Sequence, residues 1–285
     1  MKIYPIQTGT VQIKTRQRQG KGRGLARKLN MMFDSDWTEP LPIFAWVIDH
    51  DEGIIVVDTG DTARTSEPGY FPFWNPYYRL GLRMDILPEQ EIGPQLRKLG
   101  ISPSDVKTLI LTHFHTDHAG GLHHFPDSKI LANGTDYKSA QGFWGKLQGY
   151  LPHRWPKWFR PTPVSFESNS AGSFEKNFRV TERGDVIIVP TPGHTPGHMS
   201  VVAEENGVYY FLAGDTTYTE QILLDEQVDG VSPDESTALM TIRKILDFAR
   251  TRPTVYLPTH DPDSLRRLRE NRVLAAEDLQ TAMAG

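Results

Sequence analysis

A cluster of potential metal ligands directly after an apolar strand is the feature that most constrains the fold of this chain. Residues 109–118 read LILTHFHTDH, in which LILT is typical of a buried strand. At the end of an extended segment, residues i and i+2 point to the same side, so His113 and His115 can face one ion. The chain must then turn, and Asp117 and His118 fall on that turn, where they can serve a second ion beside the first.

Three later strands also place a potential ligand at their carboxyl end. His194 follows the strand DVIIVP, Asp215 ends the strand FLAGD and His260 ends the strand YLPTH. Ligand sites of open sheets commonly lie beyond the carboxyl ends of strands, so we expect these side chains to join the first cluster. Because a carboxylate has two oxygens, Asp215 is suited to bridge two cations and to offset their charge.

The composition of this ligand set predicts which metals the chain binds. The sequence contains no cysteine, which excludes thiolate ligands and disulfides and leaves five histidines and two aspartates. Such a set suits two divalent metal ions, which we expect to be zinc, with iron, cobalt and manganese as alternatives. A lone histidine at a strand end is more often structural, but the whole pattern favours a binuclear site.

The rest of the chain alternates strands with helices. Apolar stretches predict strands over 42–49, 53–60, 106–113, 129–133, 185–190, 198–203, 208–215 and 254–260. Helices are expected from Pro88 to Leu99 and from Pro233 to Arg250, and the tail also has a helical pattern. Since no linker divides the 285 residues, we predict a single domain over 1–285, with loop insertions at 14–37 and 66–85.

Charge and hydropathy restrict the partners. The net charge of −4 gives no overall attraction to nucleic acid or to anionic lipid. No run of about 18 apolar residues is present, and the N-terminus MKIYPIQTGTVQIK lacks the apolar core of a signal peptide. We therefore expect no nucleic-acid partner, no membrane partner and a cytoplasmic location.

These motifs resemble those of the metallo-β-lactamase superfamily, whose hallmark HxHxDH is present as HFHTDH. TPGHTPGHMS and GDTTYT are similar to stretches of its quorum-quenching branch, the N-acyl homoserine lactonases. The resemblance implies an α+β fold, an αββα sandwich of two mixed β-sheets face to face with helices outside. It further implies two metals bridged by Asp215. The first would be held by His113, His115 and His194, and the second by Asp117, His118 and His260.

The same resemblance implies an activity, the opening of the lactone ring of N-acyl homoserine lactones. A hydroxide that bridges two metals would attack the ester carbonyl near neutral pH. Tyr218 stands three residues after Asp215, where this family has a tyrosine, and its phenol would donate a hydrogen bond to the developing oxyanion. Asp117 would carry a proton to the leaving oxygen. Without the resemblance, TTYTE would be interpreted as a plain loop with a packed aromatic side chain.

Two further polar residues have a functional and a structural interpretation. Asp58, in VVDTG, either orients a ligand histidine from outside the metal shell or caps a turn. His198 lies in the same Pro-Gly loop as His194 and is a candidate to brace it through a hydrogen bond. Both are therefore candidates for positioning roles rather than for direct ligation.

Two segments rich in aromatic residues, 70–80 and 143–160, also have two interpretations. Phe71, Phe73 and Trp74 are candidates for the wall of a pocket that binds an acyl chain. Equally, the two segments can pack on each other or form a subunit contact. The sequence does not decide between these two arrangements.

The segment 14–28 contains seven basic residues and no acidic one. Charge runs of this kind are usually solvated loops, and the interleaved glycines Gly20, Gly22 and Gly24 suggest flexibility. The alternative is a protruding loop that holds a second subunit, and we expect a homodimer.

Several other functions fit the same motifs. The main alternative is a broader lactonase or arylesterase, or a phosphotriesterase, that uses the same site on a small-molecule ester. An RNA-processing nuclease shares HxHxDH and would bind RNA through 14–28, but it is less favoured. A protein that keeps the metals only for its structure is a third class, which the complete ligand set disfavours.

Overall fold

The structure, a computed structural model, describes residues 1–281 and divides the chain into two units. Unit 1 contains Met1–Lys14 and Trp37–Val164. Unit 2 contains Thr15–Asp36 and the described residues from Ser165 onward. The single domain over 1–285 stays a prediction, and residues 282–285 lie outside the described part.

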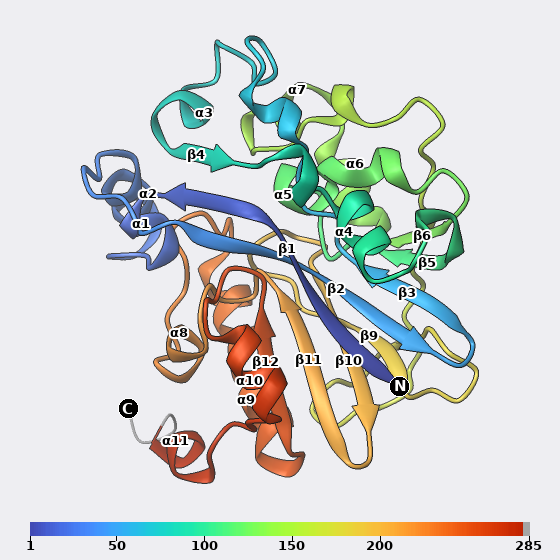
Figure 1. Cartoon of the computed structure of the whole chain (residues 1–285). Helices are drawn as coiled ribbons and strands as arrows, with labels where there is room; N and C mark the ends of the chain where they lie inside the picture. Colours follow the sequence, from blue (N-terminus) through green and yellow to red (C-terminus); the bar gives the residue numbers. More distant parts are fainter. Residues whose placement is uncertain (282–285) are drawn as a thin grey trace. The chain divides into compact units, whose positions relative to one another are not determined.

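Unit 1 is built on a seven-stranded mixed sheet (Figure 1). Neighbours are antiparallel from β4 through β1 and β2 to β3, and parallel from β3 through β5 and β6 to β7. Nearly every residue of β2 is buried, as its continuous apolar sequence requires of a strand covered on both faces. In sheet order the strands are β4 (Leu82–Asp85), β1 (Lys2–Ile13), β2 (Leu41–His50), β3 (Gly53–Val57), β5 (Val106–Ile110), β6 (Lys129–Ala132) and β7 (Thr162–Pro163).

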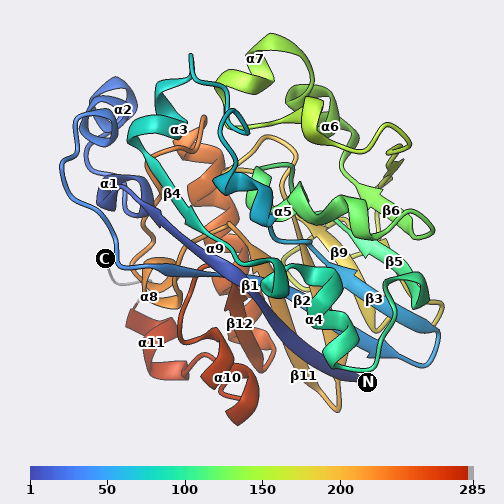
Figure 2. The ribbon, with the colours of Figure 1, turned by 45° about the horizontal axis from the view of Figure 1, so that its top comes forward.

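Short helices between the strands complete the core of unit 1. Helix α4 (Ile92–Lys98) lies over the sheet in Figure 2 and buries Ile92 and Leu96 in the same cluster as Val47 and Val56. Leu99 is the C-cap residue of this helix and is 44% exposed. The other helical segments of unit 1 are η1 (Ala63–Ser66), α3 (Pro76–Leu80), η2 (Pro88–Gln90), η3 (Pro103–Asp105), α5 (Thr116–Ala119), η4 (Gly120–His124), α6 (Gly134–Ala140), α7 (Gly142–Leu147) and η5 (Pro152–Arg154).

Unit 2 is built on a five-stranded sheet, which is also mixed. β12 and β11 are parallel, and the other neighbours are antiparallel. In sheet order the strands are β12 (Thr254–Pro258), β11 (Val208–Gly214), β10 (Met199–Glu205), β9 (Val186–Pro190) and β8 (Phe178–Arg179). The helices of unit 2 are α1 (Thr15–Arg18), α2 (Gly24–Met32), α8 (Glu220–Leu224), α9 (Glu235–Thr251), α10 (Ser264–Glu270) and α11 (Ala276–Thr281).

Helix α9 supplies one side of the unit 2 core. Its apolar residues recur every three or four positions, so one face buries Ile242, Ile245 and Leu246 in a cluster with Phe211 of the sheet. Asp234 caps its start by accepting hydrogen bonds from the backbone N–H groups of Ser236 and Thr237.

The two segments expected to be loop insertions contain regular structure. Residues 14–37 include α1 and α2, and residues 66–85 include α3 and β4, which extends the unit 1 sheet beside β1. The second segment carries a local signal for a helix. The short helix α3 begins with Pro76 after the cap Asn75, a common helix start.

Two mixed sheets with attached helices confirm the fold class expected from the sequence. Among residues 1–281, no helix combines the length and the apolar character that crossing a bilayer requires.

Candidate metal centre

The HFHTDH motif lies where β5 is followed by α5 in unit 1. β5 ends at Ile110, three residues before His113, and α5 begins directly after its N-cap residue, His115. Asp117 and His118 are therefore on the first helical turn, while the first two histidines precede it. The change from strand to helix presents all four side chains from one short stretch.

His113 and His115 direct ring nitrogens at each other. Nε2 of His113 lies 3.0 Å from Nδ1 of His115, and the two rings are nearly perpendicular, at 86°. Nε2 of His115 is 3.2 Å from the carbonyl oxygen of Gln148, and a carbonyl only accepts, so this nitrogen donates and Nδ1 keeps the lone pair. Two imidazole nitrogens this close fit two ligands of one cation.

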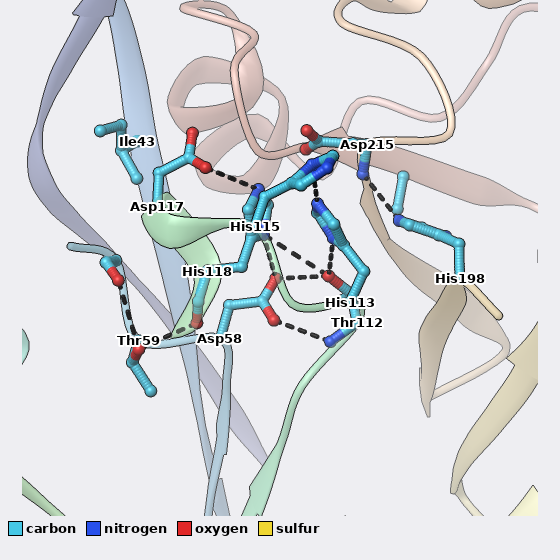
Figure 3. Close-up of polar contacts among 12 residues, drawn as sticks. Ile43, Asp58, Thr59, Thr112, His113, His115, Asp117, His118, His198 and Asp215 are labelled. Atoms are coloured by element: carbon cyan, nitrogen blue, oxygen red, sulfur yellow. Dashed lines mark hydrogen bonds and ion pairs between the residues drawn. The ribbon is translucent and has the colours of Figure 1, made fainter. Parts of the chain in front are cut away.

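A buried carboxylate forms a hydrogen bond with Nδ1 of His118 (Figure 3). Oδ2 of Asp58 lies 2.8 Å from Nδ1 of His118, and the carboxylate also accepts from the backbone N–H and the hydroxyl of Thr112, each at 2.8 Å. Because Nδ1 donates, Nε2 of His118 would be the ligating atom for a cation, and the carboxylate would raise its basicity. Asp58 thus contacts a candidate ligand, at a φ of +61° that aspartate tolerates better than most residues.

Asp117 lies next to His118 on α5. Its Oδ1 is 3.9 Å from Nε2 of His118, and its side chain is partly accessible. This pair therefore offers one oxygen and one nitrogen on the same side of the short helix, as a second cation would require.

In unit 2, two candidate histidine ligands lie beside the carboxylate of a third candidate, Asp215. Asp215, directly after β11, has Oδ2 at 3.5 Å from Nε2 of His194 and at 3.4 Å from Nε2 of His260. All three side chains are buried. A carboxylate oxygen between two imidazoles suits a ligand that bridges cations, which is the role expected for Asp215.

Asp229, which the sequence analysis did not single out, holds His194. Its Oδ2 lies 2.9 Å from Nδ1 of His194, and Oδ1 accepts from the backbone N–H groups of Val231 and Ser232. Burial raises the pKa of Asp229, but the hydrogen bonds from His194 and Ser232 outweigh it and keep the pKa below its ordinary value. An ionised carboxylate here orients Nε2 of His194 as the ligating atom.

Arg27, in the basic segment 14–28, contacts the loop that carries Asp229. Its guanidinium is 3% exposed and donates to the backbone carbonyls of Asp229 and Ser232. Gly20 also approaches closely: a Cβ there would lie 2.7 Å from the carbonyl oxygen of Val228. Part of the segment interpreted as a solvated loop is therefore packed on the loop that carries Asp229, and Gly20 serves close approach rather than flexibility.

His198 contacts the backbone beside the bridging carboxylate. The backbone N–H of Asp215 donates to its Nε2 at 3.0 Å (Figure 3), and its Nδ1 lies 2.9 Å from Oγ1 of Thr191. That hydroxyl in turn bonds Ser200, which donates to the carbonyl of Ala213. These contacts place His198 as a support for Asp215, whereas the sequence suggested a brace for His194.

Tyr218 lies among the candidate ligands of unit 2. Its ring stacks on His260, with centroids 5.4 Å apart, and approaches His194 edge-on at 6.3 Å. The side chain is 3% exposed. This burial also fits the alternative of a plain loop with a packed aromatic side chain, and the ring contacts with two imidazoles place Tyr218 beside the candidate ligands.

The aromatic segments contact each other within unit 1. The side-chain amide of Asn75 donates to the carbonyl of Lys146, and the guanidinium of Arg154 donates to the carbonyl of Tyr70 and lies over its ring. Phe71 stacks on Tyr78 with centroids 4.6 Å apart. Packing therefore accounts for these residues.

The remaining aromatic candidates differ in their exposure. Phe73 and Trp74 are exposed, at 81% and 41%, while Phe159 is buried in the core. The side chains of Phe143 and Trp144, which belong to the second aromatic segment, lie outside the described residues. Phe73 and Trp74 are thus more exposed than Phe71 among the three candidates for a pocket wall.

The donor chemistry in each unit fits divalent cations. Unit 1 gathers His113, His115, Asp117 and His118, and unit 2 gathers His194, Asp215 and His260. A carboxylate or carbonyl oxygen fixes the outer nitrogen of His115, His118 and His194, which is the usual environment of metal-bound histidine.

Comparison with known proteins places these residues in a family. The model of the metallo-β-lactamase superfamily matches residues 38–260. The curated relative AttM of Agrobacterium fabrum, an N-acyl homoserine lactonase, is 25% identical over 268 residues, which cover 93% of this chain and 94% of AttM.

Solved structures show the same fold. An N-acyl homoserine lactone hydrolase with N-hexanoyl-L-homoserine bound at its catalytic metal centre matches with a TM-score of 0.75 and 22% identity, over 95% of this chain and 96% of that one. AidC, a dizinc quorum-quenching lactonase, matches with a TM-score of 0.64 and 17% identity, over 91% and 87%.

Proposed function

Because this chain belongs to the metallo-β-lactamase superfamily, we propose that it is a metal-dependent hydrolase that opens the lactone ring of N-acyl homoserine lactones. The observation that carries the proposal is the environment of Asp215, whose carboxylate lies between His194 and His260 with Tyr218 stacked on the latter. Its similarity to AttM over nearly the whole of both chains supports the substrate class.

The proposed centre uses seven ligands for two metals. His113, His115 and His194 hold the first, Asp117, His118 and His260 hold the second, and Asp215 bridges them. The support comes from each unit separately, since both contain histidines whose outer nitrogens are fixed by a carboxylate or carbonyl oxygen. We propose zinc as the metal, because the N/O set suits it and AidC is a dizinc enzyme.

The bound metals would supply an acidified water as nucleophile and would polarise the lactone carbonyl. The residues of the chain contribute the remaining steps. The phenol of Tyr218 donates a hydrogen bond to the carbonyl oxygen as negative charge develops on it. Asp117, whose carboxylate is partly accessible, carries a proton to the ring oxygen as the C–O bond breaks. The leaving oxygen stays tethered, so the product is an open hydroxy acid.

A substrate panel tests the proposal. Homoserine lactones, plain lactones, aryl esters and a phosphotriester should be compared by kcat/KM, with metal-loaded protein and with protein treated with a chelator. We expect the homoserine lactones to have the highest kcat/KM and the chelator to abolish turnover. A phosphotriester that is hydrolysed faster than every lactone would overturn the assigned substrate class.

The assembly and the location also stay predictions. A homodimer is supported by the apolar side chains that α2 and its C-cap residue expose, among them Leu25 at 73% and the C-cap Phe33 at 77%. Light scattering coupled to gel filtration would measure the mass in solution. The cytoplasmic location would be tested by cell fractionation.

A further inference from the structure

Unit 1 contains a second group of metal-binding side chains, outside the HFHTDH motif. Glu91, His123 and His124 each offer one ligand atom, and these atoms lie within 4.8 Å of one another. Glu91 directly precedes α4 as its N-cap residue, and the two histidines end η4. The proposed hydrolytic reaction uses none of them.

Both imidazoles direct Nε2 at the same carboxylate oxygen. Oε2 of Glu91 lies 2.8 Å from Nε2 of His124 and 3.2 Å from Nε2 of His123. Two atoms that each lie about 2.1 Å from a tetrahedral zinc ion are about 3.4 Å apart. A small outward movement of these side chains would therefore admit an ion between them.

The carboxylate of Glu91 is already held in place. Its other oxygen, Oε1, accepts hydrogen bonds from the hydroxyl of Thr62 and from the backbone N–H of Ala63, both at 2.9 Å. Burial raises the pKa of Glu91, but the hydrogen bonds from Ala63, His124 and Thr62 outweigh it and lower the pKa. The group is thus an ionised, oriented ligand at neutral pH, supported as metal-binding carboxylates usually are.

A cation would replace the proton that Nε2 of His124 donates to Glu91, as metal binding to histidine generally releases a proton. Burial, together with the neighbouring His123, lowers the pKa of His124 and keeps its imidazole neutral at neutral pH. Nδ1 of His123 lies 3.4 Å from the carbonyl oxygen of Gly120, which can accept a proton from this nitrogen when Nε2 binds a cation. Because the side chain of His123 is 46% exposed, an ion can enter from solvent and keep water in its remaining positions.

We propose that Glu91, His123 and His124 form a separate binding site for a borderline divalent cation such as zinc, with water completing the coordination. An ion here would tie the start of α4 to the end of η4. Through Glu91 it would also hold Thr62 and Ala63, a few residues after Asp58, which supports His118. The site would stabilise unit 1 and is independent of the hydrolytic reaction.

The direct test counts bound zinc. Wild type, His123→Ala and His123→Gln should be dialysed against excess zinc and then analysed by mass spectrometry of the metal. The control is His153→Ala, which also removes an exposed histidine. We expect wild type and the control to hold one zinc per chain more than either His123 variant. Equal zinc in all four proteins would overturn the site, whatever the metal content of the hydrolytic centre.

Thermal unfolding gives a second readout that does not depend on counting. A ligand that binds only the folded protein raises the melting temperature. Zinc should therefore raise the melting temperature of wild type more than that of His123→Ala, whereas the two should melt together in chelator. The same increase with zinc in both proteins would contradict the proposal, even if lactone hydrolysis is confirmed.

Discussion

Oδ2 of Asp229 lies 2.9 Å from Nδ1 of His194, and both side chains are buried. Asp58 and His118 form the matching pair in unit 1, at 2.8 Å. Each unit therefore contains a candidate ligand histidine whose Nδ1 is hydrogen-bonded to a buried carboxylate. Since such carboxylates raise the basicity of the imidazole and fix its tautomer, they affect metal affinity without touching the metal.

Asp229→Asn should weaken metal binding by about 10- to 100-fold, because the amide can still accept from Nδ1 but carries no charge. Competition with a chromophoric chelator would measure the metal affinity. Asp225→Asn is the control, since Asp225 is exposed in the neighbouring helix end. An unchanged affinity in Asp229→Asn would remove the role assigned to this carboxylate.

Tyr218→Phe should lower kcat for lactone hydrolysis by roughly 100-fold, the usual effect of losing one hydrogen bond to an oxyanion. Metal content should not change, because phenylalanine can keep the stacking on His260. Tyr210→Phe, which removes a hydroxyl bonded to Asn271 on the surface, is the control. Turnover by Tyr218→Phe at the wild-type rate would show that the phenol has no part in the reaction.

Phe73→Ala and Trp74→Ala should raise KM for long-chain homoserine lactones more than for short-chain ones, if these side chains line the acyl pocket. Because Phe73 is 81% exposed, Phe73→Ala loses little packing and its melting temperature should change little. Phe71→Ala is the contrasting variant, because it removes a stacked ring and should destabilise the protein. KM values that shift equally for all chain lengths would argue against a pocket wall.

Arg27→Ala should destabilise the protein, because it leaves the carbonyls of Asp229 and Ser232 without their donor. A buried acceptor left unpaired costs about 1–3 kcal/mol. Chemical denaturation would measure the loss, and Lys28→Ala, an exposed neighbour, should stay within about 0.5 kcal/mol of wild type. Equal stability of the two variants would mean that the contact contributes nothing.

Asp234→Ala should lower the melting temperature by a pH-dependent amount. Hydrogen bonds from the side chains and backbone of Thr237 and Ser236 lower the pKa of Asp234 to about 2. Because the folded-state pKa is below the ordinary value of 3.8, the stabilisation is present above about pH 4 and is lost as the pH falls toward 2.

The gap in melting temperature between wild type and Asp234→Ala should therefore be constant above about pH 4 and should narrow below it. Asp263→Ala serves for comparison, since Asp263 precedes α10 without a side-chain capping bond. A gap that widens in acid would contradict the assigned role of the Asp234 carboxylate.

The strands with strong local patterns were predictable, and one long strand was not. β2, β5, β9, β10, β11 and β12 all fall within or beside the predicted ranges, because each is a run of apolar residues. The twelve-residue strand β1 was missed because Pro5 and Gly9 interrupt its pattern. Pairing with β2 overrides this local signal, and the register shifts between Gln7 and Thr10.

The same contrast holds for the candidate site. The proposed ligands stand at strand ends in a spaced motif, which the sequence displays directly. Asp229 and Arg27 lie in ordinary loop and helix sequences, and their role depends on contacts between residues 35 and 202 positions apart. Contacts between residues so far apart in the sequence form only in the folded chain. A local sequence pattern therefore does not predict the role of Asp229 or of Arg27.

The edge strands of the unit 1 sheet, β4 and β7, affect how molecules associate at high concentration. Strand addition from another molecule requires a row of accessible backbone N–H and C=O groups along an edge strand. That row spans four residues at β4 and only two at β7, where Pro163 has no N–H to donate. The long apolar strands β1 and β2 lie inside the sheet. Fibril growth seeded on the native unit 1 sheet is therefore disfavoured.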